Sequence, residues 1–221
     1  MKKLKQNSLI VSCQALSDEP LHGSQIMAKM AKAAKIGGAS GIRANSPTDI
    51  KAIKDKVELP LIGLWKNELA DYNVYITPRY KEVEAVLKAG ADYVAIDCTD
   101  RKRPEPLKDI FDKINKNYPE RGIIADISSI KDLPLMEELK PDYISTTLSG
   151  YTNNTKDRKR PDIELVKELS NLTEIPILAE GNYKNGQQAK IALEAGAYAV
   201  VIGAAITRPQ VITKRIIEDM Q

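Results

Sequence analysis

Histidine is nearly absent from this sequence, which contains only His22 among its 221 residues. A single imidazole excludes a histidine-rich metal site, and no cluster of Cys, His and Asp residues has zinc-site spacing. No nucleophile triad is visible, because His22 stands alone and is interpreted as a packing residue at the entry of a helix. No P-loop pattern occurs either. We therefore expect no bound metal ion.

Cysteine is also scarce, and its two positions, Cys13 and Cys98, lie far apart inside apolar runs. This placement is typical of buried, reduced thiols in the cytoplasm. No apolar run approaches the ~20 residues that span a bilayer, and no export signal follows the short, Lys-rich segment Met1–Ile10. We expect a cytoplasmic protein with no membrane partner.

Neither sign of charge dominates the chain. The 33 Lys and Arg residues face 30 Asp and Glu residues, the net charge is +3, and the signs alternate along most of the sequence. This balance is weak evidence for nucleic-acid binding, so we expect no nucleic-acid partner. The 43% of apolar residues suffices for a sizeable core.

Short apolar segments alternate with longer, charged segments whose apolar residues recur at helical spacing. The predicted strands are Leu9–Gln14, Gly41–Ala44, Pro60–Lys66, Tyr93–Cys98, Gly122–Ile127, Tyr143–Leu148, Pro176–Glu180 and Ala199–Gly203. The predicted helices are Gln25–Ile36 (with Ser24 as N-cap), Pro47–Lys54, Pro78–Ala89, Glu105–Asn117, Ser129–Leu139, Asp162–Leu169, Gly186–Ala195 and Pro209–Met220. Eight such units predict a (β/α)8 TIM barrel that occupies residues 1–221 as a single domain. A doubly wound open sheet is the competing fold, but it would usually carry a Gly-rich turn after its first strand.

Polar residues stand where the predicted strands end, and in a TIM barrel these ends meet at one mouth. The set comprises Gln14, Arg43, Lys66, Asp97, Thr99, Asp126, Thr146, Thr147, Glu180, Thr207 and Arg208. Ordinary strand-end packing explains any one of them, but the whole set favours an active site.

Small residues follow the last two predicted strands, where such barrels commonly bind phosphate through backbone N–H groups. We expect Gly181, Asn182, Gly203 and Ala204 to bind a phosphate, although ordinary turn glycines would give the same pattern. The run Arg101–Arg103 is interpreted as a solvated charge run, or else as a group that draws in an anionic substrate.

Lys66 is the strongest candidate for a catalytic residue, because it follows an unusually apolar strand. Partial desolvation at the mouth of a barrel would disfavour its charged form and let it act as a base. A lysine that reaches out to solvent is the alternative. Glu180 offers a carboxylate that could work with Lys66 in inverting a C–H centre.

Long motifs over essentially the whole chain resemble the N-acetylmannosamine-6-phosphate 2-epimerases of sialic acid catabolism. These motifs are Ser12–Leu16, Asp18–His22, Gly41–Asn45, Tyr75–Pro78, Ala125–Ser128, Ser145–Thr152, Ala179–Gly181 and Gly203–Pro209. The resemblance implies a cofactor-independent and metal-independent TIM barrel that interconverts N-acetylmannosamine 6-phosphate and N-acetylglucosamine 6-phosphate. Because family barrels of this kind associate, we expect a homodimer formed through outer helices.

By this resemblance Lys66 and Glu180 are the catalytic pair. The same resemblance places four further polar residues around the sugar: Gln14, Arg43, Asp126 and Arg208. Whether Glu180 protonates the opposite face of the sugar or only orients its neighbours stays open at this point.

The chain departs from the family pattern at Asn67, Arg79 and Asn182-Tyr183. Two other functions compete with the epimerase. One is a phosphate-binding barrel isomerase or synthase of histidine, tryptophan or thiamine biosynthesis, whose strand-end residues should differ. The other is a non-catalytic phosphosugar-binding regulator, which should have lost its proton-transfer groups. Lys66 and Glu180 within these motifs argue against both.

Overall fold

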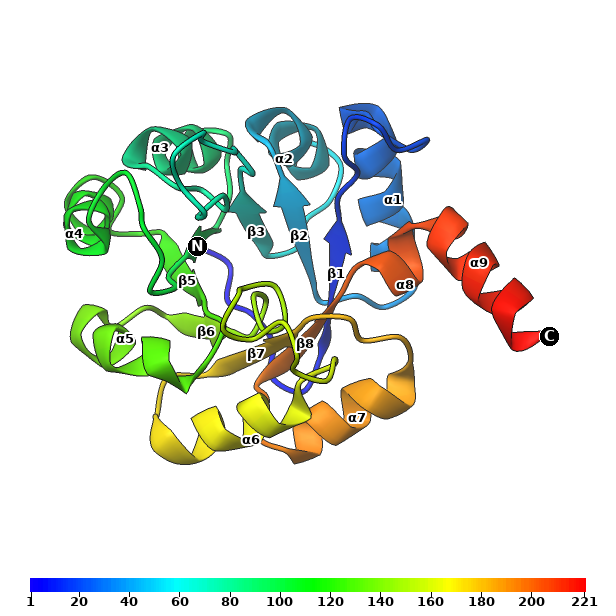
Figure 1. Ribbon diagram of the computed structural model, residues 1–221. Coiled ribbons are helices and arrows are strands. Elements are labelled where there is room, and N and C mark those ends of the chain that lie inside the picture. The colour runs from blue at the N-terminus through cyan, green and yellow to red at the C-terminus, as the bar shows by residue number, and fades with distance from the viewer.

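Eight parallel strands close into a barrel in the computed structural model, which describes residues 1–221, and this confirms the predicted fold (Figure 1). Each strand pairs with its neighbours in the sequence, and β8 pairs with β1. The strands are β1 Leu9–Cys13, β2 Gly41–Asn45, β3 Leu61–Leu64, β4 Tyr93–Asp97, β5 Gly122–Asp126, β6 Tyr143–Ser145, β7 Ile177–Glu180 and β8 Ala199–Ile202.

Helices cover the outside of the barrel (Figure 1). They are α1 Ser24–Ile36, α2 Pro47–Lys54, α3 Tyr80–Lys88, α4 Leu107–Asn117, the 3-10 helix η1 Ile130–Asp132, α5 Leu133–Leu139, α6 Ile163–Leu172, α7 Gly186–Glu194, α8 Ala204–Thr207 and α9 Pro209–Asp219. None of these helices combines the length and the apolar character that a membrane span requires.

The core has two layers, because strand side chains alternate between the barrel interior and the covering helices. Inside, Ile10, Ile62, Ile124 and other buried side chains fill the barrel. Outside, helix and strand approach so closely at Gly63 that an added Cβ would lie 2.6 Å from Val86 Cγ1. The strands are therefore buried on both faces, which explains why they read as continuous apolar runs.

Several predicted boundaries were wrong. The helix expected from Pro78 begins at Tyr80. Thr77, just before it, adopts a positive φ of 47°, and its hydroxyl accepts from Trp65 N and donates to the Ala95 carbonyl. Ser24 lies inside α1, and the N-cap is Gly23, whose φ of 134° favours glycine. Lys66 lies just beyond β3 and pairs with Ile76 across a single antiparallel bridge.

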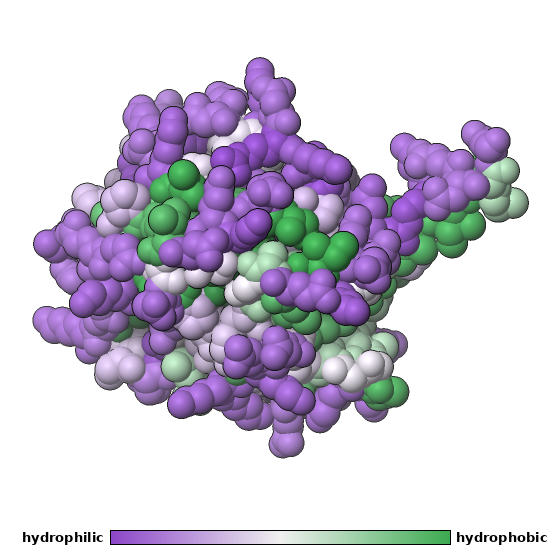
Figure 2. Space-filling model, turned by 90° about the horizontal axis from the view of Figure 1, so that it is seen from below, coloured by the Kyte–Doolittle hydropathy of each residue, from purple (hydrophilic) through white to green (hydrophobic).

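The last helix, α9, projects away from the barrel instead of packing against it (Figure 1). None of its residues is buried, and Ile216, Ile217 and Met220 are 52%, 52% and 78% exposed. Figure 2 shows an apolar strip along this projecting helix. The short α8 that precedes it was not predicted from the sequence.

Candidate active site

A cavity of about 560 Å³ opens at the carboxyl ends of the strands and brings together nearly all of the predicted site residues. Its wall contains Gln14, Arg43, Lys66, Glu180, Gly181, Asn182, Gly203, Ala204 and Arg208. Asp126 lies outside the wall, since its side chain is fully buried behind Arg43. Three of the predicted strand-end residues, Asp97, Thr99 and Thr146, also lie outside the wall. The volume suits one small polar molecule.

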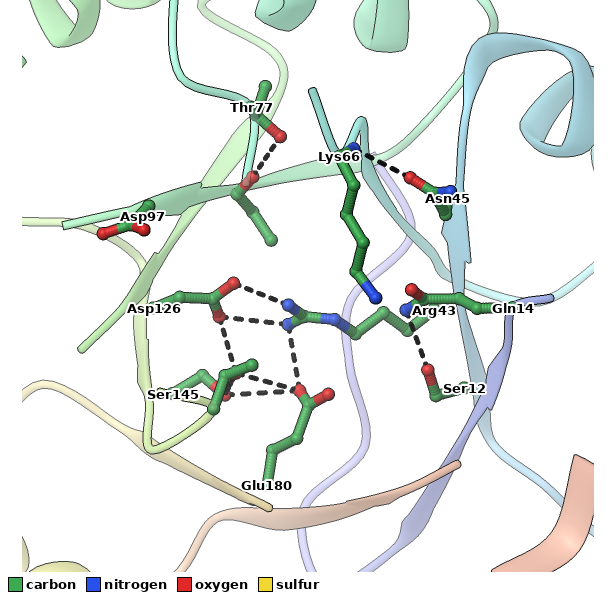
Figure 3. A network of polar contacts seen from close by, with 12 residues as sticks. Ser12, Gln14, Arg43, Asn45, Lys66, Thr77, Asp97, Asp126, Ser145 and Glu180 are labelled. Carbon is green, nitrogen blue, oxygen red and sulfur yellow. Dashed lines mark hydrogen bonds and ion pairs between the residues drawn. The ribbon is translucent and has the colours of Figure 1, made fainter. Parts of the chain in front are cut away.

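Arg43 is the centre of the polar network at the base of this cavity (Figure 3). Although only 1% exposed, it donates to Asp126 through Nη1 at 3.1 Å and through Nη2 at 2.6 Å. Its Nη1 also lies 3.0 Å from Glu180 Oε2. Two carboxylates thus hold one guanidinium in a fixed plane, as buried charges require.

Thr147 joins the two carboxylates to each other. Its Oγ1 lies 2.8 Å from Asp126 Oδ1 and 3.1 Å from Glu180 Oε2, and Ser145 Oγ lies 2.8 Å from it. The sequence marked Thr147 as a strand-end residue, but nothing in the pattern assigned it this bridging position.

Lys66 extends its ammonium group into the cavity, toward Arg43 and Gln14 (Figure 3). Asn45 fixes the start of this side chain, because its Oδ1 accepts a hydrogen bond from Lys66 N at 2.8 Å. The ammonium itself forms no hydrogen bond or ion pair with protein, and it is therefore free to meet a ligand.

The electrostatic surroundings of Lys66 favour its neutral form. Burial lowers the pKa of Lys66 below its ordinary value, and the positive charges of Arg43 and Arg208 lower it further. The carboxylates of Glu180 and Asp126 oppose this shift without reversing it. Burial similarly raises the pKa of Glu180, against the effect of Arg43. Opposite shifts in neighbouring groups are typical of proton-transfer sites.

Two buried polar atoms beside Lys66 have no protein partner. Gln14 donates through Nε2 to Ser12 Oγ at 2.9 Å, but its Oε1 accepts nothing, and Arg43 Nε donates to nothing. Buried polar atoms are normally satisfied, so these two can serve a ligand in the cavity.

The loops after β7 and β8 carry the residues predicted to bind phosphate. Gly181 and Asn182 both adopt positive φ, at 123° and 62°, and Gly203 stands directly before α8. A short helix after the last strand is a frequent phosphate-binding element in TIM barrels. Arg208 follows it and pairs with Glu19 at 2.8 Å.

Only part of the run Arg101–Arg103 is solvated: Lys102 is exposed, as the sequence indicated, whereas Arg101 and Arg103 are partly buried and bind the end of β4. Arg101 Nη2 lies 2.5 Å from the buried Asp97 Oδ2, and Arg103 Nη1 donates to the Asp97 carbonyl at 2.9 Å. This network stands apart from the cavity wall and fixes the end of β4. No group of three or more His, Cys, Asp or Glu side chains is placed to hold a metal ion.

Comparisons with known proteins show the family of this chain. The family described as "Putative N-acetylmannosamine-6-phosphate epimerase" matches residues 27–221. Relatives named "Putative N-acetylmannosamine-6-phosphate 2-epimerase" are 50% identical in Caldanaerobacter subterraneus subsp. tengcongensis, over 96% of this chain and 90% of the relative, and 49% identical in Oceanobacillus iheyensis, over 96% and 97%.

Among solved structures, the N-acetylmannosamine-6-phosphate 2-epimerase from Clostridium perfringens is 47% identical, with a TM-score of 0.94 over 98% of this chain and 94% of that one. A thiamine phosphate pyrophosphorylase from Pyrococcus furiosus has a TM-score of 0.61 over 96% of each chain, but at 16% identity it shares the fold alone.

Proposed function

The chain belongs to the N-acetylmannosamine-6-phosphate epimerase family, and from this premise we propose that it interconverts N-acetylmannosamine 6-phosphate and N-acetylglucosamine 6-phosphate. Such an isomerase serves sialic acid and amino sugar catabolism in the cytoplasm, where the buried free thiols of Cys13 and Cys98 would stay reduced. The observation that carries the proposal is the unpaired, desolvated Lys66 beside a fixed Arg43.

The reaction inverts C2 of the sugar. In the open-chain form C2 lies next to the C1 aldehyde, whose carbonyl acidifies the C2 proton. Neutral Lys66 takes this proton as a general base, which leaves an enolate. Arg43 stabilises the negative charge that develops on the carbonyl oxygen. Return of the proton to the opposite face of C2 completes the epimerisation.

We propose that Lys66 and Glu180 form the proton-transfer pair, with Lys66 as the base. Glu180 Oε2 is engaged by Arg43 at 3.0 Å and by Thr147 at 3.1 Å, which fixes the guanidinium. Glu180 also lines the cavity, and burial raises its pKa, which favours a carboxyl group that can return a proton to the opposite face of C2. Asp126 supports Arg43 from behind, as its burial requires.

The remaining site residues bind the substrate. Gln14 Oε1 is placed to accept a hydrogen bond from the acetamido group or a hydroxyl, and Arg208 faces the same cavity. The backbone N–H groups of Gly181, Asn182, Gly203 and Ala204 hold the 6-phosphate, and this remote binding energy orients C2 at Lys66. No resident cofactor is needed, because the substrate's own carbonyl stabilises the carbanion.

Proton NMR tests the assignment directly. The purified protein should convert N-acetylmannosamine 6-phosphate into a mixture with N-acetylglucosamine 6-phosphate without added cofactor or metal, and it should run in reverse. Neutral N-acetylmannosamine is the matched control, since it lacks the phosphate and should react far more slowly. Failure to convert the phosphorylated sugar would refute the proposed function.

We further propose that the protein is a homodimer, with the apolar side chains of α9 covered by a second copy of the chain. Ile216, Ile217 and Met220 project into solvent, and a monomer would leave this apolar strip exposed. The double variant Ile216→Ser/Ile217→Ser should be monomeric by light scattering while the native chain is dimeric. A monomeric native chain at the same concentration would contradict this proposal.

A further inference from the structure

The outer wall of the active-site cavity carries three cations, two of which come from the projecting helix. Val211, Lys214, Arg215 and Glu218 all line the cavity. Their spacing of three and four residues places them on one face of α9. Lys184, from the loop after β7, lies on the same wall, and its carbonyl accepts from Arg215 Nη1 at 3.4 Å. We call Lys184, Lys214 and Arg215 the basic rim.

The basic rim carries positive charge that no nearby carboxylate neutralises, unlike the arginines deeper in the cavity. At the base of the cavity, Arg43 is balanced by Asp126 and Glu180, and Arg208 is paired with Glu19. By contrast, Lys184 and Arg215 form no ion pair, and Lys214 has only a 3.8 Å contact with an exposed glutamate, which water screens. The net charge of the rim therefore faces the cavity entrance.

We propose that the basic rim captures the phosphate group of the substrate electrostatically and guides it to the loops after β7 and β8. This inference rests on the proposed function, which supplies a substrate with a phosphate dianion near neutral pH. A cleft lined by charge of one sign raises the association rate of an oppositely charged substrate by ~10–10³-fold. It also makes α9 a part of the active site, since two of the three rim cations belong to that helix.

The basic face and the apolar face of α9 then have different functions. The face with Lys214 and Arg215 borders the cavity, while Ile216 and Met220 lie on the opposite face. Contact of that apolar face with a second copy would hold the rim in place.

The test is a triple variant, Lys184→Gln, Lys214→Gln and Arg215→Gln, with a matched control that removes three exposed cations from α3 and α4. The control carries Lys81→Gln, Lys108→Gln and Lys116→Gln, which lie outside the cavity wall. At about 10 mM ionic strength the Debye screening length is ~30 Å, so the rim charges act over the whole cavity entrance. Under these conditions kcat/KM of the rim variant should fall about 10-fold, mostly through KM. At about 150 mM the difference should shrink, and the control should match the native chain at both salt concentrations.

Titration calorimetry with inorganic phosphate gives a second, activity-independent readout. The rim variant should bind phosphate several-fold more weakly than the control. Lys184→Gln alone should show about a 2-fold effect at low salt, and it leaves the backbone contact to Arg215 intact.

Equal kcat/KM and equal phosphate affinity in rim and control variants would overturn the inference while leaving the epimerase assignment standing. Rim-dependent phosphate binding by a protein that does not epimerise the sugar would instead overturn the proposed function and support the rim.

Discussion

Removal of the Asp126 carboxylate should destabilise the whole barrel through Arg43. The substitution Asp126→Ala takes away hydrogen bonds of 3.1 and 2.6 Å from a guanidinium that is only 1% exposed, and Nη2 is left without its counter-ion. Breaking a buried ion pair on one side costs about 3–5 kcal/mol. Because Glu180 still lies 3.0 Å from Nη1, we expect the lower end, about 3 kcal/mol.

For a chain of this size, a loss of about 3 kcal/mol lowers Tm by about 6–12 °C. Urea unfolding at one fixed protein concentration measures the free energy of unfolding from the midpoint, provided that the slope m is unchanged. The double variant Arg43→Met/Asp126→Leu is the control, because it removes the two fully buried charges and leaves only Glu180, whose side chain is 14% exposed. It should recover at least half of the lost stability and no activity. A loss below about 1 kcal/mol in Asp126→Ala, or no recovery in the double variant, would refute this account of the pair.

Two further predictions concern packing and pH. Gly63→Ala should lower the free energy of unfolding in urea by about 1–3 kcal/mol, because its Cβ would lie 2.6–2.8 Å from Val86, Ala91 and Ile50. Gly186→Ala is the control, because its Cβ would have nothing within 4 Å, and its effect should be neutral or slightly stabilising. Equal effects of the two variants would contradict the close helix–strand contact. The pH profile of kcat/KM should lose activity toward acid pH as Lys66 becomes protonated, with a midpoint below the ordinary lysine value of about 10.4, since burial and neighbouring cations lower its pKa. The residual activity of Glu180→Gln should shift this midpoint to lower pH, because the lost negative charge raised the pKa of Lys66; a shift to higher pH would contradict the electrostatic argument.

The alternation of apolar and amphipathic segments was sufficient to predict the barrel, because each strand is buried on both faces and the helices other than α9 bury one face. Strand ends follow from the same pattern, and so Arg43, Lys66 and Glu180 were found as residues of one mouth. Local backbone chemistry was harder to predict. Thr77 adopts a positive φ, and α3 begins only at Tyr80, a start that residue helix propensities do not indicate.

The features that the sequence did not predict depend on contacts between segments that are distant in the chain. Asp126 stands at a strand end like the other site residues, but only the packed structure puts Arg43 between it and the cavity. The run Arg101–Arg103 looks solvated in sequence, yet Arg101 forms an ion pair with the buried Asp97 four residues earlier. Periodicity predicted α9 as a helix, but not that it would leave the barrel and carry the basic rim.

The central claim is that Lys66 moves the C2 proton, and proton NMR in D2O with N-acetylmannosamine 6-phosphate tests it most directly. Lys66→Ala should remain folded, because its ammonium has no protein partner, and should lose both C2 exchange and epimerisation by at least ~10²-fold. Glu180→Ala should lose exchange and inversion together if Lys66 serves both faces, whereas exchange without inversion would assign the second face to Glu180. Wild-type-like epimerisation by Lys66→Ala would contradict the mechanism and the assignment of the catalytic residues.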